Sequence, residues 1–373
     1  MPGYLGRFVD SLAQLCDAVM CFQHRPTPGS EPLDYSIKAR NVRLVSLPRH
    51  ASVPRRMLQA KRIGKIVARY TETLDAMLIR GPSPLLPAIA QAVFPLPVAL
   101  LLVGDYVAGV NTLPQPPWRR ELIRLWCKWN NRGQDRIAKR ALVLVNSRVL
   151  FTEYASKGCN VVETRTTTLG EQDFVVRDDA CTKGPPYRIL FVGRIDAAKG
   201  LLDIAEAVRL VRERGHDAVL DVVGWPQARD ETLRGLQTYC AKHRLPLKYH
   251  GFKSVGPNLF AHYAGADIFV VASRSDFEGF PRTIWEAMAH SVPVVATRVG
   301  SIPEFLVNGR QALLVSPRSP QAIAGAIEDL LTRPDLVRRL TFAGRTLARG
   351  NTLDRRAREM VSAIAAFVKG NSR

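Results

Sequence analysis

Two glutamates separated by a turn are the residues of this sequence whose spacing most clearly indicates chemistry. Glu278 and Glu286 lie eight residues apart, and the segment between them begins with Gly279-Phe280-Pro281. Proline fits the first position of a helix, where its missing N–H costs nothing, so we expect a helix to begin at Pro281. The next three backbone amides would then point out of the positive helix end and form an anion site. These amides belong to Arg282, Thr283 and Ile284.

An anion site with a carboxylate on either side suits a ligand that carries hydroxyls on both sides of a phosphate group. A nucleotide-sugar is such a ligand.

A second motif follows an apolar segment, Ile189–Val192, that we expect to be a strand. The chain continues through Gly193 and Arg194 to Lys199 and Gly200, and a helix is expected from about Leu201. A guanidinium and an ammonium group five residues apart across such a turn can converge on one diphosphate. Many strand-to-helix loops carry Arg and Lys without binding phosphate, so this loop taken alone leaves both interpretations open.

Taken together, the two motifs resemble the family-4 retaining glycosyltransferases, an α/β family with the GT-B fold. The resemblance extends from Arg188 to Leu331. The matching segments are Gly193–Gly200, Val222–Gly224, His250–Phe252, Glu278–Ala289, Pro293–Thr297, Gly300–Glu304 and Asn308–Val315. The resemblance implies two Rossmann-like domains that face each other across a cleft.

The resemblance also implies roles for single residues. Arg194 and Lys199 would hold the donor diphosphate in place of a metal ion, so we expect neither a metal nor a cofactor. Glu278 would face the transferred sugar, and Glu286 would accept both ribose hydroxyls. The other donor-binding residues would be Gly3, Gly193, Gly251, Phe252, Lys253, Gly279, Phe280, Pro281, Arg282 and Thr283, with Gly251–Lys253 beside the nucleobase.

The amino-terminal half matches the family less well. The segment from Gly3 to Gly6 resembles the end of the glycine-rich first loop, with the usual double glycine reduced to Gly3. Where many relatives have an acceptor-side histidine, this chain has Asp105. Asp105 is our candidate to orient or deprotonate the acceptor hydroxyl, with Arg80 nearby; a cap of the following loop is an equally good explanation of Asp105.

The alternation of short apolar segments with amphipathic ones indicates parallel α/β sheets. We expect an amino-terminal domain over residues 1–170, a linker over 171–186, a donor-binding domain over 187–350, and a carboxy-terminal helix over 351–373 that packs back toward the first domain. Expected strands of the first half are Ala18–Phe22, Val42–Ser46, Ala76–Ile79, Val98–Val103 and Leu142–Asn146. Those of the second half are Arg188–Val192, Val219–Val223, Leu247–Tyr249, Ile268–Val271, Val292–Ala296 and Ala312–Val315.

No strand precedes the first expected helix, Arg7–Cys16, although a doubly wound domain normally begins with one. Either the sequence starts late or the first domain lacks its first strand.

Residues 81–104 carry no charged side chain and are long enough to span a bilayer. Pro95 and Pro97 divide this segment, however, so a helix over Leu85–Phe94 followed by a strand over Val98–Val103 explains it better.

The formal net charge of +20 indicates an anionic partner, either nucleic acid or an acidic lipid surface. Residues 35–71 contain ten Lys or Arg and no acid. Residues 55–69 have a helical spacing of apolar and basic residues, and Trp118, Trp126 and Trp129 lie among Lys and Arg residues in the sequence. No nucleic-acid-binding motif is present, so we expect peripheral contact with an anionic membrane; core tryptophans beside a solvated basic face are the alternative.

Six cysteines without a CxxC pair argue against a zinc site and for a reducing compartment. We therefore expect a cytoplasmic enzyme at the inner face of the membrane. It would be a metal-independent retaining glycosyltransferase that moves a sugar from a UDP-sugar to a lipid-linked glycan or a cell-envelope polysaccharide precursor. The alternatives are a degenerate homologue that acts as a binding partner and, less favoured, a nucleic-acid-binding protein.

Overall fold

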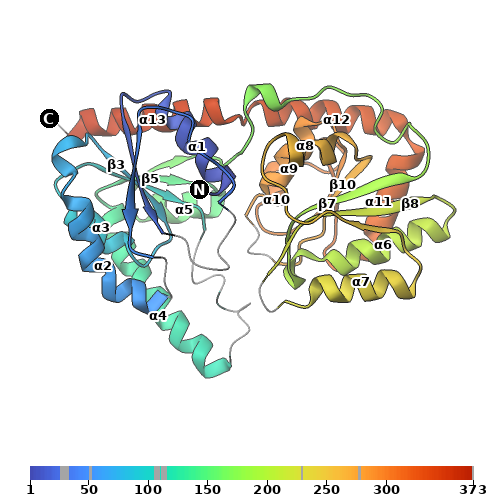
Figure 1. Ribbon diagram of the computed structural model, residues 1–373, viewed down its shortest axis with the longest axis horizontal. Helices are drawn as coiled ribbons and strands as arrows, with labels where there is room; N and C mark the ends of the chain where they lie inside the picture. Colours follow the sequence, from blue (N-terminus) through green and yellow to red (C-terminus); the bar gives the residue numbers. More distant parts are fainter. Residues whose placement is uncertain are drawn as a thin grey trace. The chain divides into compact units, whose positions relative to one another are not determined.

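The computed structural model divides into two compact units, which we call the first unit (Met1–Thr166 with Arg356–Arg373) and the second unit (Thr167–Arg355) (Figure 1). It describes residues 1–25, 33–49, 53–104, 110, 116–227, 230–275 and 279–371. Two of the expected site residues, Asp105 and Glu278, lie outside the described residues.

The second unit is built on a six-stranded parallel sheet with the order β12-β11-β10-β7-β8-β9. The strands are β7 (Tyr187–Ile195), β8 (Ala218–Pro226), β9 (Leu247–Tyr249), β10 (Ile268–Val271), β11 (Val294–Thr297) and β12 (Leu313–Val315). Read from β9, this is the 3-2-1-4-5-6 order of a dinucleotide-binding Rossmann sheet. All six strands predicted for the second half are confirmed, with ends that shift by a few residues.

Helices cover both faces of this sheet because successive strand residues point to opposite sides. Within β7, Ile189 and Phe191 belong to one buried cluster, whereas Leu190 and Val192 belong to another. Helices α6 (Leu201–Glu213), α7 (Thr232–Lys242) and α11 (Pro320–Thr332) add side chains to the first cluster, and α8 (Pro257–Ala264) and α9 (Arg282–Ala289) to the second. The described part of this unit also contains the short α10 (Ile302–Phe305) and the long α12 (Pro334–Arg349).

The first unit contains two parallel sheets, the pair β1-β2 and the four-stranded order β3-β4-β5-β6. The strands are β1 (Val19–His24), β2 (Val42–Leu47), β3 (Met77–Gly81), β4 (Val98–Leu102), β5 (Leu142–Val145) and β6 (Asn160–Glu163). The helices are α1 (Gly3–Ala13), α2 (Val53–Ala68), α3 (Leu86–Ala92), α4 (Pro117–Ala138), α5 (Arg148–Ser156) and most of α13 (Leu353–Asn371). The sequence did not predict β6.

The strands of the first unit form two separate sheets for a topological reason. In the 3-2-1-4-5-6 order, the first strand joins the second and third strands to the rest of the sheet. The described part of the first unit has α1 before β1 and no strand before α1, so β1 and β2 pair only with each other.

The uncharged segment 81–104 forms α3 and β4, as predicted. No helix among the described residues is both long and apolar enough to cross a membrane.

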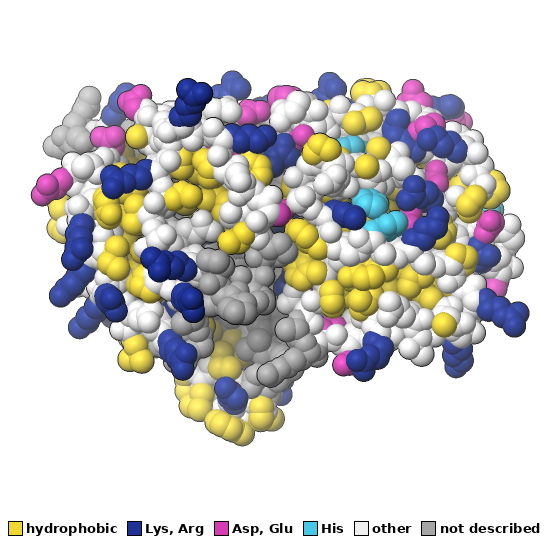
Figure 2. Space-filling model, viewed as in Figure 1, with side chains coloured by type: hydrophobic (Ala, Val, Ile, Leu, Met, Phe, Trp, Pro, Cys, Tyr) yellow, Lys and Arg dark blue, Asp and Glu magenta, His cyan; other side chains and the backbone are white. Residues whose placement is uncertain are grey.

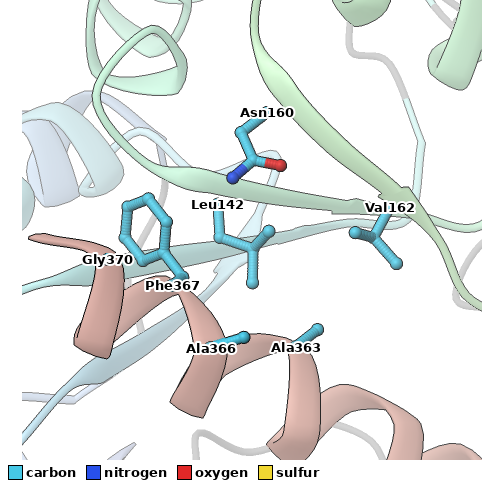
Figure 3. A pocket seen from close by; sticks show the side chains of 7 residues that line it. All are labelled: Leu142, Asn160, Val162, Ala363, Ala366, Phe367 and Gly370. Carbon is cyan, nitrogen blue, oxygen red and sulfur yellow. The ribbon is translucent and has the colours of Figure 1, made fainter.

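The carboxy-terminal helix α13 lies against the sheet of the first unit. Met360 is 3% exposed and packs with Leu142 and Leu144 of β5. Further along, Ala363 and Phe367 face the side chains of β5 and β6 across a small surface cavity (Figure 3). By contrast, the predicted linker 171–186 belongs to the second unit, because Ala180 and Cys181 are buried in its core.

Candidate functional site

The second unit places both sequence motifs at the carboxyl ends of the strands of its sheet. Strands β7 and β10 are neighbours, and the order of the strands reverses between them. In open α/β sheets, ligands bind outside the carboxyl ends of the strands at such a switch point. The motif of Arg194 and Lys199 follows β7, and the motif that leads into α9 follows β10. The fold therefore gives both motifs a common position.

The loop after β7 is shorter than the sequence predicts, because β7 continues to Ile195 and includes Gly193 and Arg194. Ala197–Lys199 then form a single 3₁₀ turn, which Asp196 caps by accepting a hydrogen bond from the Ala198 amide at 3.0 Å. The side chain of Arg194 is 50% exposed, and its guanidinium lies 3.7 Å from the Asp196 carboxylate. Arg194 is thus accessible to a ligand, and Lys199, at the end of the 3₁₀ turn, is half-buried.

Backbone contacts join this loop to the segment after β10. Gly200 has a φ of +65°, and a Cβ atom at this position would lie 2.0 Å from the carbonyl oxygen of Ala272. The amide of Arg274 donates a hydrogen bond to the carbonyl oxygen of Ala198 at 2.8 Å. Only glycine allows this approach, so Gly200 determines how closely the two loops meet.

Arg274 is a residue of this site that sequence reasoning missed. Its guanidinium pairs with the carboxylate of Asp203 in the first turn of α6. Asp203 lies 71 residues away in sequence, so no local motif marks the pair.

The start of α9 differs by one residue from the prediction. Pro281 is the residue before the helix, with a φ of −66° and a ψ of 123°, and the helix itself begins at Arg282. The amide of Ile284 donates to the carbonyl oxygen of Pro281 at 3.0 Å. This bond removes Ile284 from the predicted set of three amide donors and leaves Arg282 and Thr283 as the amides of the expected anion site.

The turn before α9 is anchored by aromatic packing. The ring of Phe280 lies 4.3 Å from that of Trp285 and 4.9 Å from that of Phe305, measured between centroids. Gly279 is exposed, and, its chain neighbours apart, no atom of the described residues lies within 4 Å of the position of a Cβ atom on it. Phe280 therefore fixes the turn by packing on Trp285 and Phe305. The roles expected of Gly279 and Glu278 toward the sugar stay predictions.

Glu286 lies deeper than a ligand-facing carboxylate. It is 3% exposed, and its two oxygens accept hydrogen bonds from the hydroxyls of Thr168, at 2.6 Å, and Tyr263, at 2.8 Å. Burial, followed by the nearby carboxylate, raises the pKa of Tyr263 well above its usual value, so Tyr263 stays a donor. A ribose that approached Glu286 would therefore compete with two hydroxyls of the protein.

The segment predicted to lie beside the nucleobase, Gly251–Lys253, is at the same end of the sheet and next to β8. The amide of Gly224 donates to the carbonyl oxygen of Gly251 at 2.9 Å, and Phe252 packs edge-on against Trp225 with 5.3 Å between centroids. Just before this turn, His250 lies 2.9 Å from the buried carboxylate of Asp221. Lys253 is half-buried in the same turn.

The first unit gives Gly3 a different environment from the expected one. Its amide, at the start of α1, donates to the carboxylate of Asp34 at 2.7 Å. The positive end of α1 thus already has a negatively charged partner from its own unit. The guanidinium of Arg80 lies 5.4 Å above the ring of Tyr4.

All six cysteines are free thiols. No group of three or more His, Cys, Asp or Glu among the described residues could hold a metal ion.

Comparison with known proteins identifies the second half of the chain. The family model of the glycosyl transferases group 1 matches residues 186–333. The D-inositol 3-phosphate glycosyltransferase of Paenarthrobacter aurescens is 33% identical over 165 residues, which are 41% of this chain and 38% of that protein. A GDP-mannose-dependent alpha-(1-6)-phosphatidylinositol monomannoside mannosyltransferase of Mycobacterium tuberculosis is 30% identical over 190 residues, 49% of this chain and 47% of that protein. The chain thus spans less than half the length of these curated relatives.

Solved structures extend the likeness of fold to nearly the whole chain. Sucrose-phosphate synthase from Thermosynechococcus elongatus superimposes with a TM-score of 0.74 at 18% identity and covers 98% of this chain and 93% of its own. Anabaena HepE in complex with UDP and glucose gives a TM-score of 0.71 at 16% identity, with 98% and 96% covered. The chain therefore has the GT-B fold, and residues 186–333 match the family model of the glycosyl transferases group 1.

Proposed function

We propose that this protein is a metal-independent, retaining glycosyltransferase that takes its sugar from a nucleotide-sugar. The observation that carries the proposal is the position of Arg194, Lys199 and the start of α9 at the β7–β10 switch point of a group 1 domain. Two cations and a positive helix end suit a diphosphate.

The proposed reaction uses these groups to stabilise the leaving group. The bond between the anomeric carbon and the donor phosphate breaks, and negative charge develops on the departing nucleoside diphosphate. Arg194, Lys199 and the amides of Arg282 and Thr283 would stabilise that charge without a metal ion. The acceptor hydroxyl attacks from the face that the leaving group vacates, and its proton passes to a phosphate oxygen. The anomeric configuration is retained, with Glu278 facing the sugar.

For the donor we propose a UDP-sugar, and for the acceptor a lipid-linked glycan or a cell-envelope polysaccharide precursor. The names of relatives support an acceptor of this kind, since they include a phosphatidylinositol monomannoside mannosyltransferase and the amylovoran biosynthesis glycosyltransferase of Erwinia amylovora. The first of these uses GDP-mannose, which makes GDP-mannose the competing donor. The proposed location is the cytoplasm, peripheral at the inner face of the membrane.

Release of nucleoside diphosphate by the purified protein tests the proposal. We expect release from one of UDP-glucose, UDP-galactose, UDP-N-acetylglucosamine and GDP-mannose, undiminished by EDTA, and abolished in Arg194→Ala. The matched control is Lys242→Ala, at an exposed position on α7. Absence of release from every donor would contradict the proposed activity, and inversion in an isolated product would contradict retention.

One observation favours a second candidate, a degenerate homologue that binds a partner. The amide of Gly3 is occupied by Asp34, whereas the resemblance expects the first loop to contact the donor. This candidate predicts nucleotide binding in calorimetry without turnover of any of the four donors.

A further inference from the structure

Helix α4 exposes large apolar side chains on its solvent face. Trp118 is 66% exposed, Leu122 58%, Leu125 55% and Trp129 62%. We call these four residues the α4 stripe. Their spacing of four, three and four residues places them within roughly 60° of one another around a helix of 3.6 residues per turn. They therefore form one continuous outer face rather than scattered surface residues.

The opposite face of α4 packs against the first unit, and it is the more polar one. Its buried residues are Cys127, Asn130, Gln134 and Ala138. The amide of Gln134 donates to the hydroxyl of the buried Tyr154 at 2.7 Å. A surface helix of a globular protein normally turns its apolar face inward and its polar face to water. The inverted arrangement of α4 means that packing within the first unit does not account for the stripe.

Cations flank the α4 stripe. Helix α4 carries six Lys or Arg and two acids, Glu121 and Asp135. At about 100° per residue, Lys128 and Arg132 fall on one side of the stripe and Arg119 on the other. All three cationic side chains are exposed. The exposed Glu121 falls between Lys128 and Arg132 on the same side. The stripe is thus an apolar strip with a net positive charge on both sides.

The neighbouring helices extend this surface. Helix α3 packs on α4, and α2 packs on α3. Helix α2 has five Lys or Arg and no acid, and its Leu58 is 86% exposed. Figure 1 shows α4 reaching beyond α2 and α3, and Figure 2 shows hydrophobic side chains at its far end with Lys and Arg beside them.

We propose that α4 is an interfacial helix whose stripe inserts into the headgroup region of an anionic lipid bilayer. Tryptophan and leucine on one face and Lys or Arg on the flanks are the composition of helices that lie in the membrane interface. Each cation near the surface adds to the attraction toward acidic lipids. A second copy of this chain carries the same net charge of +20 and would be repelled, and nucleic acid offers no apolar layer for the leucines.

This inference deepens the membrane location proposed above and rests on it, but it does not depend on the donor chemistry. Sedimentation with vesicles therefore tests it separately from nucleotide release.

The experiment measures binding to phosphatidylcholine vesicles with and without phosphatidylglycerol. We expect the unmodified protein to bind only the anionic vesicles, and Trp118→Ser/Trp129→Ser to bind at least about tenfold more weakly, because two large apolar side chains lose their burial. The matched control is Phe342→Ser, which removes a side chain that is also 66% exposed, on α12 of the second unit. The control should bind as the unmodified protein does.

A charge variant separates the contribution of the cations to vesicle binding from that of the apolar side chains. Lys128→Glu/Arg132→Glu should weaken binding at low salt and matter less at high salt. Circular dichroism on both double variants establishes that they fold.

Failure of the unmodified protein to bind anionic vesicles would overturn the inference, as would equal binding by the tryptophan variant. A change of oligomeric state in that variant with vesicle binding intact would assign the stripe to contact between copies instead. If vesicles bind but no donor releases nucleotide, the proposed reaction fails while the docking surface stands.

Discussion

Arg274 and Asp203 form a two-point ion pair that joins the end of β10 to the first turn of α6. The guanidinium Nε lies 2.8 Å from Oδ2, and Nη2 lies 2.6 Å from Oδ1. Asp203 is 7% exposed, and the hydrogen bonds that Arg274 donates to its carboxylate raise the pKa of Arg274. Since the amide of Arg274 also binds the carbonyl oxygen of Ala198, this pair holds the loop that carries Lys199.

Arg274→Ala should therefore cost both stability and activity. Removal of the guanidinium leaves the Asp203 carboxylate nearly buried without this partner, which should lower the free energy of unfolding by about 2 kcal/mol. The loop of Lys199 loses its support, so kcat should fall while the affinity for the nucleoside diphosphate changes little. Urea unfolding and steady-state kinetics measure the two effects.

The control for this prediction is Arg234→Ala on α7. Arg234 pairs with Glu231 at 2.9 Å, but the side chains are 80% and 70% exposed, so we expect a change below about 0.5 kcal/mol. Equal effects of the two substitutions would show that the Arg274–Asp203 pair does not position the loop.

Substitutions in the proposed donor site should separate effects on turnover from effects on donor binding. Lys199→Ala should lower kcat by about a hundredfold with a small change in KM, because its ammonium group acts mainly on charge that develops in the transition state. Glu286→Gln keeps the volume of the side chain and removes its charge, so it should raise KM about tenfold if Glu286 binds the ribose. Steady-state kinetics with the active donor measures both, with Lys242→Ala as the control.

The burial of Glu286 sets the choice of variant. Glu286→Ala would also leave the hydroxyls of Thr168 and Tyr263 without their acceptor, and a loss of folding would then obscure the kinetics. Mild and equal changes in kcat and KM for Lys199→Ala and Glu286→Gln would contradict the assignment of the donor site to the carboxyl ends of β7 and β10.

The strands of the second unit were predictable because parallel strands buried on both faces appear as continuous apolar segments. Strand β6 was missed because Asn160–Glu163 has only two apolar residues between polar ones. The helix start was misplaced by one residue because a proline φ of −66° suits both the first helical position and the residue before it. The ψ of 123° shows that Pro281 is the residue before the helix, but ψ cannot be inferred from the presence of a proline.

The loops of the candidate site were found by their motifs, but the contacts that hold them were not. Thr168 and Glu286 lie 118 residues apart, and Arg274 and Asp203 lie 71 apart. No spacing rule connects positions so distant in sequence, and only the folded chain brings them together. The same holds for Gly3, whose amide meets Asp34 across residues that share no local pattern.

Gly200→Ala should destabilise the second unit more than an ordinary glycine substitution. A φ of +65° is unfavourable for alanine, and the added Cβ would lie 2.0 Å from the Ala272 carbonyl oxygen. Strain and the forced separation of the two loops should together lower the free energy of unfolding by about 3 kcal/mol. Urea unfolding measures the change.

Gly215→Ala is the control for Gly200→Ala. Gly215 also has a positive φ, +92°, but, its chain neighbours apart, no atom in the described part of the chain lies within 4 Å of its Cβ position, so only backbone strain of about 1 to 2 kcal/mol is expected. If the two variants unfold alike, the contact between Gly200 and Ala272 carries no energy of its own.

The buried His290 should make stability depend on pH. His290 is 1% exposed at the end of α9, with its Nδ1 atom 2.8 Å from the carbonyl oxygen of Glu286. Burial is the largest influence and lowers the pKa of His290 below its usual 6.5. Below pH 6.5 the unfolded chain binds a proton at this position that the folded chain binds less readily. The contribution of His290 to stability is therefore present above pH 6.5 and is lost as the pH falls toward the lower pKa of the folded state.

Replacement of His290 by a residue that does not titrate should remove this part of the pH dependence. We expect His290→Asn to flatten the curve of unfolding free energy below about pH 6.5, whatever its effect at neutral pH. Urea unfolding at a series of pH values measures the two slopes, and His243→Asn, at an exposed site on the end of α7, controls for the loss of a histidine. Parallel curves for His290→Asn and the unmodified protein would show that His290 takes up its proton equally well in the folded and unfolded states.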